Sequence, residues 1–91
     1  MLVKHLRDVG IPYATIVALY PDQIGLSICC TKDHFSKKRG VEIAKGRAIY
    51  NCKPEVPNRL VYHYDEGNYV IKHMSEVVYQ ELVNMEKRAQ K

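Results

Sequence analysis

Residues 31–48 read TKDHFSKKRGVEIAKGRA and predict a loop followed by a helix. The stretch holds six of the fourteen basic residues of the chain, which are Lys32, Lys37, Lys38, Arg39, Lys45 and Arg47. Asp33 and Ser36 are candidate N-caps, because a short oxygen side chain accepts a hydrogen bond from the unpaired amides of a first helical turn. The sequence therefore places positive charge at the start of a helix.

One face of the helix predicted over residues 36–51 is expected to pack, because small and apolar side chains recur there with helical spacing. That face comprises Ser36, Gly40, Ile43, Ala44, Arg47, Ala48 and Tyr50, and the opposite face carries Lys38, Glu42, Lys45 and Ile49. A glycine inside a helix lowers the stability of the helix by about 1 kcal/mol relative to alanine, so a glycine there indicates a compensating role. At Gly40 we expect that role to be close approach to a sheet or to a bound group.

Arg47 is a guanidinium in the middle of this packing face. One interpretation is that it pairs with Asp33 or caps backbone carbonyls at the edge of the core, because an unpaired buried charge is very costly. The other is that its planar fork binds a phosphate or a carboxylate. For Lys37 and Lys38 the alternatives are a solvated helix face and contact with an anion.

The residues before the loop predict a β-hairpin. Residues 13–20, YATIVALY, are rich in β-branched and aromatic side chains, and a Pro-Asp-Gln turn leads from them into a second strand over residues 24–30. In the second strand, apolar side chains alternate with Gly25, Ser27 and Cys29, so its second face is small enough to admit a helix backbone or a ligand. Residues 2–9 are predicted to form a short helix ended by Gly10 and Pro12, or a frayed or swapped arm.

The residues after the helix predict a connector, a second hairpin and a last helix. Residues 52–58, CKPEVPN, contain two prolines that neither a helix nor an inner strand tolerates. Residues 60–64 and 69–73 then flank the turn sequence DEGN, which is typical of a hairpin. Ser75 is the predicted cap of the last helix, whose apolar stripe is Val77, Val78, Leu82, Met85 and Ala89. The stripe suits packing on a sheet as well as association with a second copy.

These elements predict one α+β domain over residues 1–91. Two antiparallel β-hairpins are expected to form a four-stranded sheet with two main helices in the order ββαββα, preceded by the short helix or the arm at the N-terminus. The length is near the lower limit at which a single core suffices, so oligomerisation would add stability.

Composition favours a cytoplasmic protein with an anionic partner. The formal net charge is +4 and the isoelectric point is near 9.0. The sequence contains no apolar run of about 18 residues and no leader pattern, so neither a membrane span nor secretion is predicted. The three cysteines, Cys29, Cys30 and Cys52, are too few for a disulfide framework and are expected to be buried free thiols. No catalytic motif, metal site or cofactor is predicted, so the chain is interpreted as a binding protein and not as an enzyme.

The stretch around the helix resembles a widespread family of small phage-encoded proteins with the pattern Lys-Asp-x-Phe-x-Lys-Lys-x-Gly-x-x-Ile-Ala-x-x-Arg-Ala. The matching positions are Lys32, Asp33, Phe35, Lys37, Lys38, Gly40, Ile43, Ala44, Arg47 and Ala48. The likeness extends to the VPN loop at residues 56–58 and covers about two thirds of the chain, and Gly46 departs from it. We associate the family with phage sponges, the anti-CBASS and anti-Thoeris proteins that sequester nucleotide signals of bacterial immunity.

The resemblance implies a phage immune-evasion protein that binds a cyclic dinucleotide or related nucleotide signal without cleaving it. Two phosphates and two bases require several cations and flat side chains, and a pocket shared between subunits of a dimer or tetramer would supply both. The candidate phosphate contacts are Thr31, Lys32, Lys37, Lys38 and Arg47, and the candidate base platforms are Tyr20, Tyr62 and Tyr64. The alternatives are non-specific binding of nucleic acid and inhibition of a host protein.

Overall fold

The structure, a computed structural model, describes residues 1–29 and 36–90. Within these residues the chain forms five strands and two helices, which are β1 (Leu2–Asp8), β2 (Ile11–Tyr20), β3 (Gln23–Ile28), α1 (Lys37–Ile49), β4 (Leu60–Asp65), β5 (Asn68–His73) and α2 (Met74–Ala89). The mixture of strands and helices agrees with an α+β chain. The sheet architecture differs from the prediction.

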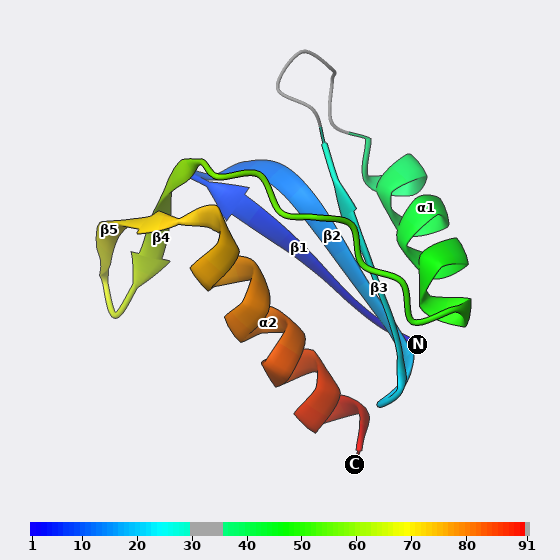
Figure 1. Cartoon of the computed structure of the whole chain (residues 1–91). Helices are drawn as coiled ribbons and strands as arrows, with labels where there is room; N and C mark the ends of the chain where they lie inside the picture. Colours follow the sequence, from blue (N-terminus) through cyan, green and yellow to red (C-terminus); the bar gives the residue numbers. More distant parts are fainter. Residues whose placement is uncertain (30–35, 91) are drawn as a thin grey trace.

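The strands form two separate antiparallel sheets, so the predicted four-stranded sheet is wrong. One sheet has the strand order β1-β2-β3, and the other consists of β4 and β5 alone (Figure 1). The hairpins β2–β3 and β4–β5 do not pair with each other because side-chain and backbone groups from other parts of the chain contact the strand edges that such pairing would use. At β4, the Tyr62 amide donates to the Asp8 carboxylate over 2.9 Å, and the Val9 amide donates to the Tyr62 carbonyl over 3.3 Å.

The predicted N-terminal helix is also wrong, because residues 2–8 form strand β1. This strand pairs with β2 in a register that runs from Leu2 opposite Ala18 to Leu6 opposite Ala14. The chain reverses at Val9 and Gly10, whose φ angles of 48° and 81° are those of a tight two-residue hairpin turn. Backbone pairing with the β-rich run that follows therefore outweighs the weak helical spacing of this segment.

The two helices cover opposite faces of the three-stranded sheet, giving three layers (Figure 1). The alternation of side chains along β2 determines which face each residue serves. Ile16 packs in the cluster on the α2 side with Leu26, Met74 and the buried residues of α2. Val17 packs on the α1 side with Ala44 and Ala48. The sheet thus separates a larger core from a smaller one.

Helix α1 lies very close to β3, as the small face of that strand predicted. A Cβ atom placed on Gly25 would lie 2.9 Å from the Ala48 Cα and would also overlap the Ala44 carbonyl oxygen. The helix buries Gly40, Ala44 and Ala48, and the Ser36 hydroxyl caps it by accepting the Arg39 amide over 3.2 Å. The prediction of Ser36 as cap is confirmed, and the alternative cap Asp33 lies outside the described residues. The predicted packing of Tyr50 is wrong, because the helix ends before this exposed residue.

Helix α2 confirms the predicted apolar stripe as a core element. Val77, Val78 and Met85 are buried, and Leu82 and Ala89 pack against them. The predicted cap at Ser75 is wrong, because the chain passes directly from β5 into a helix that begins at Met74. The Met74 amide donates instead to the Arg59 carbonyl over 2.7 Å. None of the helices in the described part of the chain is long and apolar enough to cross a membrane.

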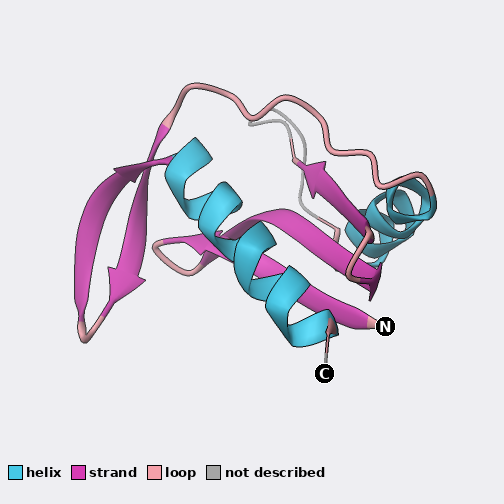
Figure 2. Cartoon of the chain, turned by 60° about the horizontal axis from the view of Figure 1, so that its bottom comes forward, coloured by secondary structure: helices cyan, strands magenta, loops and turns pink. Residues whose placement is uncertain are grey.

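The second hairpin, β4–β5, is confirmed and projects from the body of the molecule (Figure 2). Its turn at Glu66 and Gly67 has φ angles of 48° and 88°, as a two-residue hairpin turn requires. Val61 anchors it, since this side chain is buried in the core on the α2 side. Most of the remaining hairpin side chains are exposed.

Candidate anion-binding site

Arg47 caps a carbonyl of the neighbouring strand, as one of its two predicted interpretations requires. Its Nη1 donates to the Leu26 oxygen over 2.8 Å. The Cys29 amide donates to the Tyr13 carbonyl, so Cys29 and Tyr13 form a hydrogen-bonded pair between the β2 and β3 segments. Hydrogen-bonded and non-hydrogen-bonded pairs alternate along an antiparallel ladder, so Leu26 belongs to a non-hydrogen-bonded pair. Its carbonyl therefore points away from β2, toward the open edge of β3. The Asn51 side chain accepts the Ile24 amide over 3.0 Å at the same edge. Arg47 and Asn51 therefore cover an edge that another strand could otherwise join.

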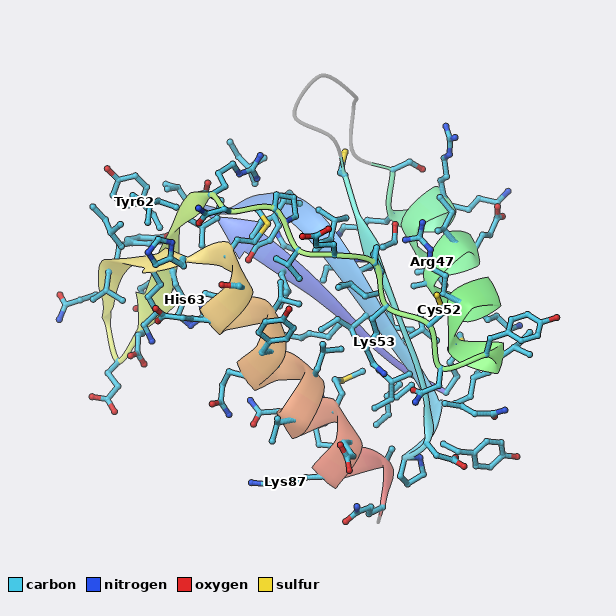
Figure 3. The ribbon with its side chains drawn as sticks, viewed as in Figure 1. Arg47, Cys52, Lys53, Tyr62, His63 and Lys87 are labelled. Atoms are coloured by element: carbon cyan, nitrogen blue, oxygen red, sulfur yellow. The ribbon has the colours of Figure 1, made fainter. Side chains whose placement is uncertain are left out.

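The other predicted ligand contacts do not converge within one chain. Lys37 and Lys38 are exposed in the first turn of α1. Tyr20 lies at the opposite end of that helix, where the Gln23 side chain donates to the Ile49 carbonyl over 3.2 Å. Figure 3 shows Arg47 on α1 and Tyr62 on the distant hairpin, which also carries Tyr64. Thr31 and Lys32 lie outside the described residues.

Two cations from different elements, Arg7 of β1 and Lys37 of α1, do lie near one histidine, His5 of β1. We call these three residues the cationic face. The charges of Lys37 and Arg7 both act on the His5 imidazole, which places the three side chains in one neighbourhood. Sequence reasoning found Lys37 but missed His5 and Arg7, because it assigned residues 2–9 to a short helix or to a frayed or swapped arm. The signal that could have found them is the two-residue turn at Val9 and Gly10, which leads into β2.

His5 is the titratable residue of the cationic face. Its Nδ1 shares a hydrogen bond of 2.9 Å with the hydroxyl of Thr15, a fully buried residue of β2. Burial lowers the pKa of His5 from its usual 6.5, and the positive charges of Lys37 and Arg7 lower that pKa further. The positive charges of Lys37 and Arg7, which disfavour the imidazolium form of His5, would attract an anion.

We expect this lowered pKa to make folding stability depend on pH. The unfolded chain takes up a proton at His5 near pH 6.5, whereas the folded chain does so only at lower pH. The unfolded state then binds more protons, so the free energy of unfolding falls as the pH drops below about 6.5. Urea unfolding between pH 7.5 and 5.5 should show a flatter dependence for His5→Gln than for the wild-type protein. Equal slopes would contradict the assignment.

Tyr13 is a second perturbed group, but its surroundings suit packing. Burial raises its pKa to about 12, with a further contribution from Asp8. The hydroxyl is buried and has no hydrogen-bond partner within the described residues, and the Arg59 guanidinium carbon lies 6.0 Å from the ring centroid. A phenol with this pKa stays protonated at neutral pH. Tyr13 therefore adds no negative charge to the neighbourhood.

A shallow cleft of about 440 Å³ lies elsewhere, between the β2–β3 turn, the residues after α1 and one side of α2. Its lining includes the carboxylates of Asp22 and Glu86 and the ammonium of Lys53. The Lys53 ammonium donates to Asn51 over 2.9 Å. Two carboxylates opposed by one engaged cation do not suit an anion, so we favour the cationic face as the candidate site.

The described cysteines carry no sign of a metal centre. Cys29 is half-buried and Cys52 is exposed, so the expectation of a buried thiol is wrong for Cys52. Among the described residues, no group of three or more His, Cys, Asp or Glu side chains is placed to hold a metal ion.

Comparison of the chain with models of protein families, with curated proteins and with solved structures gave no match.

Proposed function

We propose that the protein binds a small anionic nucleotide, of the cyclic oligonucleotide class that serves as a second messenger in bacterial anti-phage defence, and sequesters it without cleaving it. The observation that carries this proposal is the cationic face, where the positive charges of Arg7 and Lys37 lie near the imidazole of His5. Lysine and arginine bind phosphate through charge-assisted hydrogen bonds, and histidine adds a donor when an anion favours its protonation.

The proposed contacts are Lys37, Arg7 and His5, and Lys38 follows Lys37 in the first turn of α1. Arg47 is left out of the phosphate contacts because its Nη1 bonds to the Leu26 carbonyl. Tyr20, Tyr62 and Tyr64 lie on other elements, so they are not base platforms for a ligand held at the cationic face of their own chain. Base contacts would therefore come from a pocket shared between copies of the chain.

A thermal-shift panel tests this function. Cyclic dinucleotides, cyclic trinucleotides, cyclic ADP-ribose isomers and a short DNA duplex are added separately at moderate salt. A ligand at about 100 times its dissociation constant adds roughly 2.7 kcal/mol, which raises the melting temperature of a domain of this size by about 10 °C or more. Recovery of the intact nucleotide after heating, measured by chromatography, would show sequestration without turnover.

Charge-matched variants link the shift to the cationic face. We expect Arg7→Gln with Lys37→Gln to weaken binding by roughly 100-fold or more, because each of the two lost charge-assisted hydrogen bonds costs about 1.5–3 kcal/mol. The control, Lys45→Gln with Lys87→Gln, removes the same charge from the exposed side of α1 and from the far end of α2 (Figure 3) and should leave affinity unchanged. Equal weakening by both pairs, or a response to DNA alone, would favour non-specific nucleic-acid binding. A flat panel would favour a host-protein target.

A further inference from the structure

The hairpin β4–β5 presents one apolar side to solvent. Leu60, Tyr62 and Tyr64 alternate with Val61, whose side chain is buried toward α2, so these three point to the opposite side. In the hairpin register Tyr62 lies opposite Ile71 and Tyr64 lies opposite Tyr69. Cross-strand partners share one side of a sheet. We call the surface made by Leu60, Tyr62, Tyr64, Tyr69 and Ile71 the aromatic face.

Each side chain of the aromatic face is at least half exposed. The exposed fractions are 56% for Leu60, 50% for Tyr62, 59% for Tyr64, 53% for Tyr69 and 59% for Ile71. The rings of Tyr64 and Tyr69 meet edge to face, with centroids 5.2 Å apart and planes at 70°. The surface is therefore a contiguous, partly ordered patch, unlike the single apolar residues scattered on any protein surface.

The area of the aromatic face suits a twofold interface between two copies. A large side chain presents about 200 Å² when fully exposed, so five half-exposed side chains offer about 500 Å² per chain. A stable interface of standard size buries about 800 Å² per partner. These five residues alone provide more than half of that area, and the backbone and side chains at their border can supply the remainder.

The charge distribution favours a second copy over a nucleic acid. Lys72 and Asp65 form an ion pair of 4.0 Å and, by alternation, lie on the side of the hairpin that carries Val61. On the side of the aromatic face the remaining cross-strand residue is His73, opposite Leu60, and no Lys, Arg, Asp or Glu of β4–β5 lies on that side. Aromatic platforms for nucleic acid combine stacking rings with cations that follow the phosphates. Homodimer interfaces instead have apolar centres that are rich in aromatic residues and depleted of charge.

We propose that the aromatic face is a homodimer interface, in which the hairpins of two copies pack face to face about a twofold axis. A two-stranded hairpin is only marginally stable alone, so burial against its copy would also stabilise β4–β5. The inference provides the association between copies that the proposed function uses, and it assigns Tyr62 and Tyr64 to the contact between copies and not to stacking on a base. It rests on the hairpin residues and does not depend on the nucleotide.

Sedimentation velocity without nucleotide tests the interface. From 1 to 100 µM, wild-type protein should approach twice the chain mass of 10.5 kDa. Tyr69→Glu should give the monomer mass over that range, and the milder Ile71→Ser should raise the dissociation constant by about tenfold or more. The matched control is Tyr79→Glu on α2, whose side chain is 57% exposed and lies outside the aromatic face. We expect it to remain a dimer.

Three results would overturn the dimer proposal. Wild-type protein could remain monomeric at 100 µM, Tyr69→Glu could remain dimeric, or the two glutamate variants could dissociate equally. Far-UV circular dichroism of each variant verifies that the fold is retained. A monomeric wild-type protein that binds a 20-nucleotide single-stranded DNA through Tyr69 would identify the aromatic face as a nucleic-acid platform instead. If the protein dimerises but no nucleotide raises its melting temperature, the dimer interface is supported and only the proposed ligand is contradicted.

Discussion

Replacing Gly25 with alanine is expected to lower the free energy of unfolding by about 3 kcal/mol or more, because α1 cannot stay in place. The new Cβ would overlap the Ala44 carbonyl and lie 2.9 Å from the Ala48 Cα. These neighbours are backbone atoms, so no side-chain rotation relieves the overlap and the helix must move away from β3. In a domain of this size, the melting temperature should fall by about 10 °C or more.

Gly46 supplies the matched control for Gly25. It lies inside α1, and a Cβ placed there meets nothing within 4 Å. Gly46→Ala should therefore raise stability by up to about 1 kcal/mol through helix propensity alone. Thermal and urea unfolding of both variants measure the two effects. Similar changes in the two proteins would contradict the close packing of α1 on β3.

The second large effect is expected from Arg47→Met, which keeps an apolar stem but removes the donor to Leu26. Loss of the 2.8 Å hydrogen bond leaves a carbonyl at the β3 edge without its charged partner, which costs about 2 kcal/mol. The control Lys45→Met removes the same charge from an exposed position of the same helix and should change stability by less than about 0.5 kcal/mol.

The Arg47 variants also separate a structural role from a ligand-binding role. If the guanidinium serves the β3 edge, Arg47→Met should lower the melting temperature with and without nucleotide and leave the ligand-induced increase unchanged. A variant of wild-type stability that no longer responds to nucleotide would instead place Arg47 in the binding site. Light scattering adds a further readout, because the uncovered edge of β3 could pair with another chain.

Local sequence signals predicted the elements that depend on neighbouring residues. The run YATIVALY and the turn after it indicated β2 and β3, and the small side chains at Gly25 and Ser27 indicated where a helix could approach. Ser36 marked the start of α1, and the stripe ending at Ala89 marked the packed side of α2. Turn chemistry, capping and periodicity are properties of short segments, so they can be read without knowing the fold.

The errors arose where distant residues decide the structure. Residues 2–8 have a spacing that also fits a helix, and only pairing with β2 makes them a strand. The two hairpins looked able to join, but single side chains such as Arg47 and Asp8 contact the edges that they would share. For the same reason sequence reasoning found Lys37 and missed His5 and Arg7. A cationic group built across two elements needs the sheet register before it can be recognised.

The separation of the two cores by the sheet means that the sides of the molecule can change independently. Val17, Ala44 and Ala48 form one cluster, whereas Ile16 and Met85 belong to the other. Substitutions with no shared partners have nearly additive effects on free energy. The surface around α1 could therefore be redesigned, or diversify between related proteins, without compensating changes beneath α2. Strand β2 thus lets a small chain change the surface on one side of the sheet while the larger core on the other side stays the same.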